Sequence, residues 1–402
     1  MRGKNRLNTK GMVINMYLLL LSVIYLAFIS LGLPDSLLGA AWPTIRAEFD
    51  VPLSYMGFVS MIISGGTIIS GLMSERVTRK FGTRAVTIVS VFLTAVALFG
   101  FSISTEFYQM CLWGIPYGLG AGAIDAALNN YVALHYSSRH MSWLHCFWGV
   151  GTIISPMVMS AVLAAGMRWT VGYRGVSAMQ LALSIVLFTT LKLWASEKAQ
   201  NGEREAKVLT VRQVLSLPGA KQGLLNFTCY CAVESTFMLW SATYLVMARG
   251  MDAARAASMG GLFFIGITAG RGVSGFIAMK LKPRQMVRLG QTLMAAAGVL
   301  LLVPGTAVTL AGILLMGLGC APVYPNIVQD TPRNYGAENS QAVIGVQMAF
   351  AYIGSLFMPT IFGWIASILG YGILPVFALV FTAVMIALFN SQQRIVDARN
   401  AK

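Results

Sequence analysis

Long apolar runs separated by short polar stretches dominate the pattern of this chain. About 20 consecutive apolar residues are enough for a helix to cross a bilayer, and the first such run begins near its N-terminus. The pattern predicts an all-α membrane protein with twelve spans, at 12–43, 56–75, 85–104, 108–135, 142–165, 171–194, 222–247, 256–279, 285–303, 306–328, 341–367 and 371–390. A longer polar stretch separates six from six, which predicts an N-terminal six-helix bundle over 1–194, a cytoplasmic linker over 195–220 and a C-terminal six-helix bundle over 221–402.

Composition and charge favour a membrane protein over a soluble one. Hydrophobic residues make up 56% of the 402 residues and charged residues only 11%, whereas soluble domains carry about 25% charged residues. The net charge of +15 could suggest nucleic-acid binding, but the basic residues lie in the loops between apolar runs. Most of the 29 lysines and arginines fall on the side of the two termini, which predicts a multi-pass protein of the cell (inner) membrane with both termini cytoplasmic. The first run is longer than the apolar part of a signal peptide, so we expect it to remain uncleaved.

The first predicted span carries an acid in its second half. Asp35 follows Pro34 and lies between Gly32 and Gly39. A carboxylate at membrane depth is costly, so it normally faces a cavity or a partner and marks a transport pathway. Proline removes a backbone donor, and broken helices are tolerated in membranes only where they line protein or water. We therefore expect a broken helix that presents Asp35 to a site inside the bundle.

The two predicted halves show the signs of an internal repeat. Asp35 and Glu234 are 199 residues apart, and the Gly-Leu-Gly sequences at 118–120 and 317–319 have the same separation. The pattern of Gly151 and Pro156 recurs at Gly354 and Pro359. Two six-span halves related by a pseudo-twofold axis along the membrane normal form a known transporter plan, with the binding site between them at mid-membrane.

A loop after the second span carries a charged motif. The sequence from Gly71 to Lys80 places Glu75 and Arg76 four and five residues after the glycine, and Arg79 beside Lys80. This motif resembles the loop between spans two and three of the major facilitator superfamily, with Glu75 where that family usually has Asp. We interpret Glu75, Arg76 and Arg79 as an ion-pair latch across helix ends; the alternative is that these charges only set topology.

Within that superfamily the chain resembles the fucose/glucose:proton symporter group. The resemblance rests on Asp35 in span one, the stretch from Asp125 to Asn129 in span four, Tyr230 to Glu234 in span seven and the Val-Tyr-Pro at 323–325. It implies that acids in spans one and four serve proton coupling and sugar binding, which assigns these roles to Asp35 and Asp125. Glu234 stands where the group often has an amide, and we include it among the proton-coupling candidates.

Helical spacing supports part of this assignment independently of the resemblance. Asp125 and Asn129 share a helix face with small glycines, which lets a neighbouring helix approach and turns the polar pair toward the bundle interior. A structural hydrogen bond is the alternative for Asp125. Glu234 needs a partner, and Arg271 is the one base expected to be buried in the second half, so we hypothesise an ion pair between them, either structural or broken during transport.

Aromatic and amide side chains complete the candidate binding set. Trp148, Trp240 and Tyr324 are candidate stacking platforms for a sugar ring, with Tyr230 on the face of Glu234; packing or lipid contact is the alternative for each. Amides both donate and accept hydrogen bonds, so two of them are candidate partners for substrate hydroxyls. These are Asn326 and Gln347.

We predict a secondary active transporter that works by alternating access as a proton-coupled symporter of a sugar or similar neutral polyhydroxylated solute. The alternative is a proton-coupled exporter of drugs or metabolites; a receptor or channel is a third, less favoured class. Enzyme activity is not expected, since no nucleophile–base set or phosphate loop is present, and the five cysteines show no metal spacing. We expect no cofactor, no metal and no nucleic-acid partner, only a small-molecule substrate, the lipid bilayer and the proton gradient, with sodium as the alternative ion. A monomer is expected.

Overall fold

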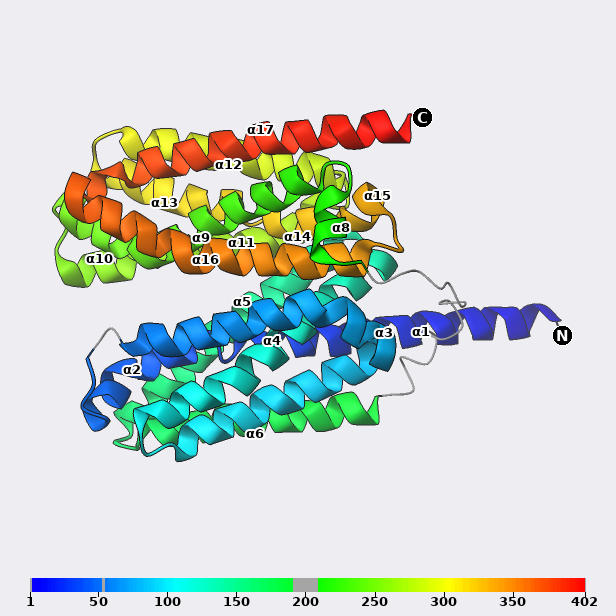
Figure 1. The fold of residues 1–402 in the computed structure, drawn as a ribbon, viewed down its shortest axis with the longest axis horizontal. Coiled ribbons are helices and arrows are strands. Elements are labelled where there is room, and N and C mark those ends of the chain that lie inside the picture. Colours follow the sequence, from blue (N-terminus) through cyan, green and yellow to red (C-terminus); the bar gives the residue numbers. More distant parts are fainter. Residues whose placement is uncertain (1, 53–54, 191–208, 402) are drawn as a thin grey trace. The chain divides into compact units, whose positions relative to one another are not determined.

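The computed structural model describes residues 2–52, 55–190 and 209–401, and in these residues every regular element is a helix (Figure 1). The all-α prediction is confirmed. The helices before the central stretch are α1 (Arg2–Gly32), α2 (Leu37–Glu48), α3 (Met56–Ile103), α4 (Phe107–His135), α5 (Ser138–Ala164) and α6 (Trp169–Thr189). Those after it are α8 (Val211–Ser216), α9 (Ala220–Arg249), α10 (Ala253–Gly260), α11 (Leu262–Ile277), α12 (Pro283–Leu302), α13 (Thr306–Cys320), α14 (Val323–Gln329), α15 (Thr331–Tyr335), α16 (Ser340–Leu369), the 3₁₀ helix η3 (Tyr371–Ile373) and α17 (Leu374–Asn400).

Ten helices in the described residues are long and apolar enough to span a membrane, which is consistent with the twelve predicted spans. One of the ten, α3, covers two predicted spans because its two stretches are joined at Gly82, where the backbone leaves helical geometry at φ 80° and ψ 152°. Only glycine adopts these angles readily, so Gly82 supplies the turn. Another predicted span, 108–135, corresponds to α4. Its 29 residues are long enough to cross a membrane, but α4 contains polar residues and is not among these ten helices.

Contacts divide the chain into two compact units. Unit 1 comprises residues 1–66, 76–128 and 147–207, and unit 2 comprises residues 67–75, 129–146 and 208–402. Short parts of α3, α4 and α5 therefore belong to the unit that contains α9 to α17. The predicted linker 195–220 lies partly outside the described residues, and its remainder contains α8, whose N-cap Thr210 forms a capping box with Gln213.

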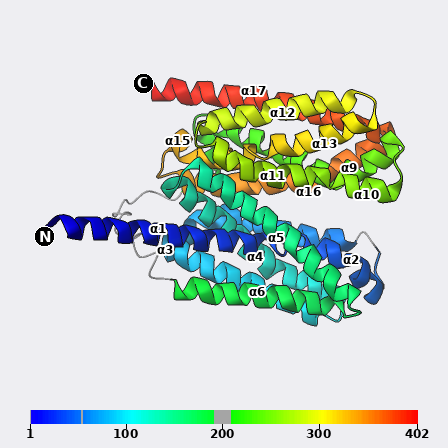
Figure 2. The ribbon, with the colours of Figure 1, turned by 180° about the vertical axis from the view of Figure 1, so that it is seen from behind.

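The core of unit 1 fixes the segment that follows the break in the first span. Helix α2 buries an apolar face that includes Leu37, Trp42 and Ile45, and this face belongs to one cluster with Trp169 of α6. The end of α2 is also tied to α6, because the indole Nε1 of Trp169 donates to the Glu48 carboxylate at 2.8 Å. Seen from behind, α2 lies beyond α1, at the end far from the N-terminus (Figure 2).

In unit 2, α9 packs against α16 and α17, and α12 packs against α13 (Figure 1). Helix α9 buries several large side chains, including Phe227, Tyr230 and Phe237. Since these residues alternate with polar ones on the same buried helix, polar groups such as Glu234 are carried into an otherwise apolar interior.

Candidate functional site

The first predicted span is broken where the sequence indicated. Helix α1 ends at Gly32 and α2 begins at Leu37, with a turn over 33–36. Pro34 has no backbone N–H and cannot continue the helical ladder. The turn instead uses hydrogen bonds between residues three apart. The Asp35 N–H donates to the Gly32 carbonyl at 3.3 Å, and the Leu37 N–H donates to the Pro34 carbonyl at 3.1 Å.

Asp35 at the break accepts hydrogen bonds from two neutral donors. The indole Nε1 of Trp148 donates to Oδ2 at 2.8 Å, and the hydroxyl of Tyr117 donates to Oδ1 at 3.1 Å. No Lys, Arg or His nitrogen in the described parts of the chain lies within 4.0 Å of this carboxylate. Asp35 is nevertheless exposed, while Tyr117 is buried and Trp148 is half-buried. The carboxylate is therefore oriented and accessible without being neutralised by a base.

Close backbone packing between α1 and α5 sets the position of Trp148. A Cβ atom at Gly32 would overlap the carbonyl oxygen of Trp148, so only glycine fits there. On the other side of Asp35, the hydroxyl of Ser36 donates to the carbonyl of Thr152 at 2.6 Å. The turn is thus held to the middle of α5 both before and after Asp35, by the packing of Gly32 and by the hydrogen bond of Ser36.

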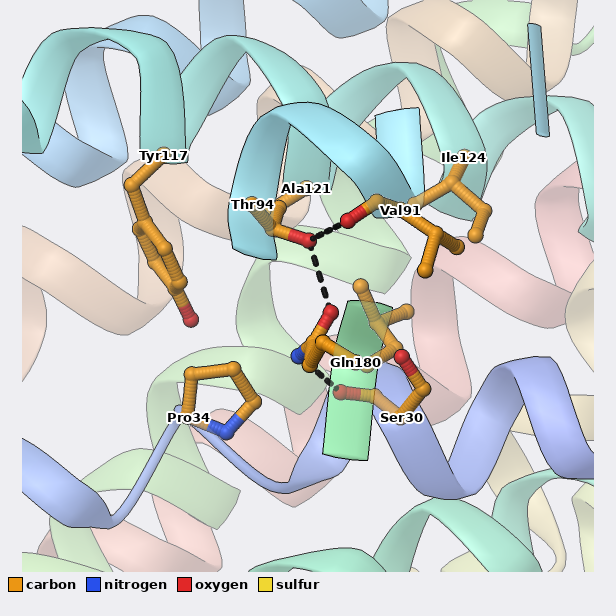
Figure 3. A pocket seen from close by; sticks show the side chains of 9 residues that line it. Ser30, Pro34, Val91, Thr94, Tyr117, Ala121, Ile124 and Gln180 are labelled. Atoms are coloured by element: carbon orange, nitrogen blue, oxygen red, sulfur yellow. Dashed lines mark hydrogen bonds between the residues drawn. The ribbon is translucent and has the colours of Figure 1, made fainter. Parts of the chain in front are cut away.

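A small pocket lies beside the break in unit 1 (Figure 3). Its volume is about 10 Å³, close to the space that one water molecule needs. Pro34 and Tyr117 face it from one side, and Gln180 of α6 points toward the break from another (Figure 3). The amide Nε2 of Gln180 donates to the Ser30 carbonyl at 2.7 Å, and Thr94 donates to Gln180 Oε1 at 2.8 Å. Sequence reasoning missed Tyr117 and Gln180, since neither is charged nor part of a recognisable motif.

The span-four acid lies on α4 and is buried. Asp125 belongs to unit 1, and Asn129, one helical turn later, belongs to unit 2. The Asn129 side chain is fully buried, and its Oδ1 lies 3.1 Å from Nε2 of His145. The His145 ring packs edge-on against Tyr324, with 4.6 Å between ring centroids. Asn129 is thus part of a buried polar and aromatic cluster, and the roles of Asp125 and Asn129 stay predictions.

Glu234 and Arg271 form the ion pair that the sequence suggested. Arg271 Nη2 lies 2.8 Å from Glu234 Oε1, and the two side chains are 3% and 10% exposed. On the same helix as Glu234, the buried Tyr230 donates its hydroxyl to the Cys320 carbonyl at 3.1 Å. Glu234 therefore differs from Asp35, because a guanidinium compensates its charge.

The aromatic candidates fall into different surroundings. Tyr324 is half-buried, lies beside Phe227 with 4.7 Å between ring centroids, and donates to the Met348 sulfur at 3.1 Å. Trp240 instead donates its Nε1 to the Pro359 carbonyl at 2.8 Å and packs beside Tyr371. Trp148 acts as a hydrogen-bond donor to Asp35 rather than only as a stacking surface.

The two amide candidates are engaged inside unit 2. Asn326 is fully buried and donates to the Pro322 carbonyl at 2.7 Å, one turn earlier in the chain. Gln347 is also buried, and its Oε1 accepts from the Thr331 hydroxyl at 3.0 Å. Both amides and Trp240 thus have partners inside unit 2, and their role in binding a solute stays a prediction.

The charged motif of the second span meets the linker region. Glu75 is buried, and its Oε2 accepts the backbone N–H of Leu209 at 3.1 Å, just before α8. Arg76 and Arg79 are exposed. The carboxylate of the motif thus caps a backbone segment, and its role as a latch during transport stays a prediction.

Neutral side chains join the helix ends that meet in unit 2. Gln341 donates to the Ser74 hydroxyl at 2.5 Å, and Ser340 donates to Asn130 Oδ1 at 2.6 Å. Gln329 donates to the carbonyl oxygen of Tyr136, just beyond the end of α4, at 2.9 Å. These contacts connect α3, α4 and the residue just after α4 to α14 and α16, at the end of the helices that the sequence predicts to be cytoplasmic.

A model of the Major Facilitator Superfamily matches residues 24–346 and 250–397 of this chain. Among curated proteins, the chain is similar to the 3-(3-hydroxy-phenyl)propionate transporter of Escherichia coli, with 25% identity over 394 residues that cover 92% of each protein.

The solved structures that share the fold include two symporters. The E. coli fucose:proton symporter FucP aligns with a TM-score of 0.73 and 15% identity over 94% of this chain and 98% of that one. The proton:xylose symporter XylE, bound to 6-bromo-6-deoxy-D-glucose, aligns with a TM-score of 0.77 and 11% identity over 96% of each chain. At these identities the likeness concerns the fold.

Proposed function

This chain belongs to the major facilitator superfamily, and from that premise we propose that it is a proton-coupled symporter in which Asp35 carries the proton. A transporter of this family is a multi-pass membrane protein that moves a small molecule across the membrane, and it is not an enzyme. Our proposal adds the driving ion, the residue that binds it and the class of solute.

One observation supports the proposal most directly, namely the contrast between the two acids at equivalent places in the halves. Glu234 is paired with Arg271 at 2.8 Å, whereas the donors to Asp35 within the described residues are the neutral Trp148 and Tyr117. A buried ion pair keeps its carboxylate charged. A carboxylate that no base compensates is costly at membrane depth, so binding a proton before the site changes sides relieves that cost.

The energy available to such a cycle is sufficient for accumulation. Moving one elementary charge through a 100 mV potential is worth about 2.3 kcal/mol, which corresponds to roughly fiftyfold accumulation of a neutral solute. One titrating carboxylate per cycle is therefore enough to drive uptake.

A neutral polyhydroxylated solute suits these groups best. Asp35 is exposed and accepts hydrogen bonds, so it can accept from a hydroxyl, and the half-buried Trp148 beside it offers an indole face. A solute carboxylate would instead meet the uncompensated charge of Asp35. Sugar symporters of the same fold support this choice, whereas the similarity to an aromatic-acid transporter favours an anionic solute as the second candidate.

The test is uptake by the purified protein in proteoliposomes with an imposed inward proton gradient. L-fucose, D-xylose and 3-(3-hydroxyphenyl)propionate serve as labelled probes, each measured with sodium and with choline in its place. Proton-driven accumulation of a sugar supports the proposal. Accumulation of the aromatic acid alone would assign the second candidate, and proton-driven loss of solute would assign an exporter.

Asp35→Asn is expected to abolish proton-driven accumulation of the transported probe while exchange of labelled for unlabelled solute continues, since the amide holds the site but binds no proton. Asp50→Asn is the matched control. Asp50 is exposed in the loop after α2 with φ 50°, a conformation that asparagine tolerates well, so this variant should accumulate solute like the wild type. Accumulation of wild-type extent by Asp35→Asn would exclude the assigned role.

A further inference from the structure

The break in the first span leaves a carbonyl without its helical partner. In an uninterrupted α-helix, the Ser30 carbonyl would accept the N–H of residue 34. Residue 34 is proline and has no N–H. Ser30 is buried, so its carbonyl oxygen cannot depend on bulk water, and a buried acceptor without a partner is costly.

Gln180 of α6 supplies the missing donor. Its Nε2 lies 2.7 Å from the Ser30 oxygen, and the side chain is buried (Figure 3). A carbonyl can only accept, so this contact requires the nitrogen of the amide on that side. The amide oxygen then faces Thr94, whose hydroxyl lies 2.8 Å away and can donate to it. The one hydrogen of the Thr94 hydroxyl is shared between this oxygen and the Val91 carbonyl at 2.9 Å, whereas the Ser30 contact fixes the orientation of the Gln180 amide.

We propose that Gln180 is a positioning residue for the proton-coupling carboxylate. Its amide replaces the donor that Pro34 removes, holds the end of α1 and thereby fixes the turn that presents Asp35 to its own donors. This inference rests on the proposed function of Asp35.

The surroundings explain why an amide is suited to this place. Ser36 is anchored downstream of Asp35 by its bond to Thr152, so Gln180 provides the anchor on the upstream side. The adjoining pocket has room for about one water molecule. A shorter residue at position 180 would enlarge this space and allow water to take over the donor role. Methionine keeps most of the glutamine volume and offers no donor, so Gln180→Met isolates the hydrogen bond.

The decisive experiment is a double-mutant cycle with Pro34→Ala. Alanine restores the N–H at position 34, so in that background the Ser30 carbonyl has its own donor and Gln180→Met should cost little. In the wild-type background, Gln180→Met should lower the Tm of the purified protein and reduce proton-driven uptake about fivefold, the factor for one net hydrogen bond of about 1 kcal/mol. Equal losses in both backgrounds would show that Gln180 only packs and would overturn the proposal.

Two further comparisons separate positioning from general stability. Thr94→Ser keeps the hydroxyl and should behave like the wild type, whereas Thr94→Val removes the donor to the Gln180 amide oxygen and should give a smaller effect in the same direction as Gln180→Met. Gln291→Met is the matched control, because Gln291 is a buried glutamine of α12 that donates to Asn226 and does not contact a break. Gln180→Met should move the pH midpoint of uptake and Gln291→Met should not; an unmoved midpoint in Gln180→Met would count against positioning.

The two proposals can fail separately. The Tm cycle uses no solute and no proton gradient, so it tests the link between Gln180 and Pro34 even if the transported solute is not a sugar. Conversely, sugar uptake that depends on Asp35, combined with additive Tm losses in the cycle, would retain the proposed function and exclude the role of Gln180.

Discussion

Neutralising Glu234 alone is expected to destabilise the protein strongly. The substitution Glu234→Gln leaves the guanidinium of Arg271 buried, 3% exposed, without the carboxylate that lies 2.8 Å from it. Removing one partner of a buried ion pair typically costs about 3–5 kcal/mol, because the remaining charge has lost both water and its counter-charge. Arg271→Gln should cost a similar amount for the same reason, since Glu234 is 10% exposed.

The double variant should be much more stable than either single variant. Two glutamines of similar size remove both charges, and replacing a buried pair by neutral groups is often close to neutral for stability. With single losses of about 3–5 kcal/mol and a double loss near zero, the coupling energy should amount to several kcal/mol.

Thermal unfolding of the purified protein in detergent measures these differences. For a chain of this length we expect each single variant to lower the Tm by roughly 5 °C, and the double variant to recover most of that loss. Additive losses in the double variant would refute the reasoning, since they would mean that the two residues stabilise the fold independently. Transport by a stable double variant would identify the pair as structural, and loss of transport would show that the cycle needs its charges.

Two further substitutions test other parts of the structure. Gly32→Ala should destabilise the protein by about 1–3 kcal/mol because its Cβ would overlap the Trp148 carbonyl, whereas Gly39→Ala, with nothing within 4 Å, should stabilise α2 by about 0.5–1 kcal/mol; thermal unfolding compares them. Burial raises the pKa of the Asp330 carboxyl despite the nearby Arg284. The folded state therefore binds the carboxyl proton more tightly than the unfolded state does, and the protonated carboxyl stabilises the fold at low pH. This contribution to stability is lost as pH rises through the raised pKa. Arg284→Gln removes the main opposing cause and raises the folded-state pKa further, so the loss of Tm with rising pH should be larger and extend to a higher pH; an unchanged pH profile would contradict this.

The broken first span was predictable because its cause is local. Pro34 and Asp35 lie side by side in an apolar run, and both disfavour a continuous buried helix. The pairing of Glu234 with Arg271 was predictable by elimination, because few charges occur in the spans and a buried charge requires a partner.

The rest of the site depends on which way each helix faces, and that is decided by packing. Trp240 and Trp148 were equivalent candidates in the sequence, but the first donates to the Pro359 carbonyl and the second to Asp35. Gln180 carries no charge and belongs to no motif, so its hydrogen bond to the Ser30 carbonyl can be seen only in the three-dimensional structure. The amide oxygen of Gln347 accepts from Thr331, a contact that the sequence does not indicate, and its role toward a solute stays a prediction.

The close packing of α1 against α5 limits how the helices of unit 1 can move. Gly32 packs against the Trp148 backbone, and Ser36 is hydrogen-bonded to Thr152. Asp35 and Trp148 are therefore expected to move together as one rigid body. Rearrangements that expose the acid to one compartment or the other must then occur around this rigid body, at its borders with other helices. Substitutions along those borders can accordingly change the surroundings of Asp35 without altering its hydrogen bond with Trp148 or the bond between Ser36 and Thr152.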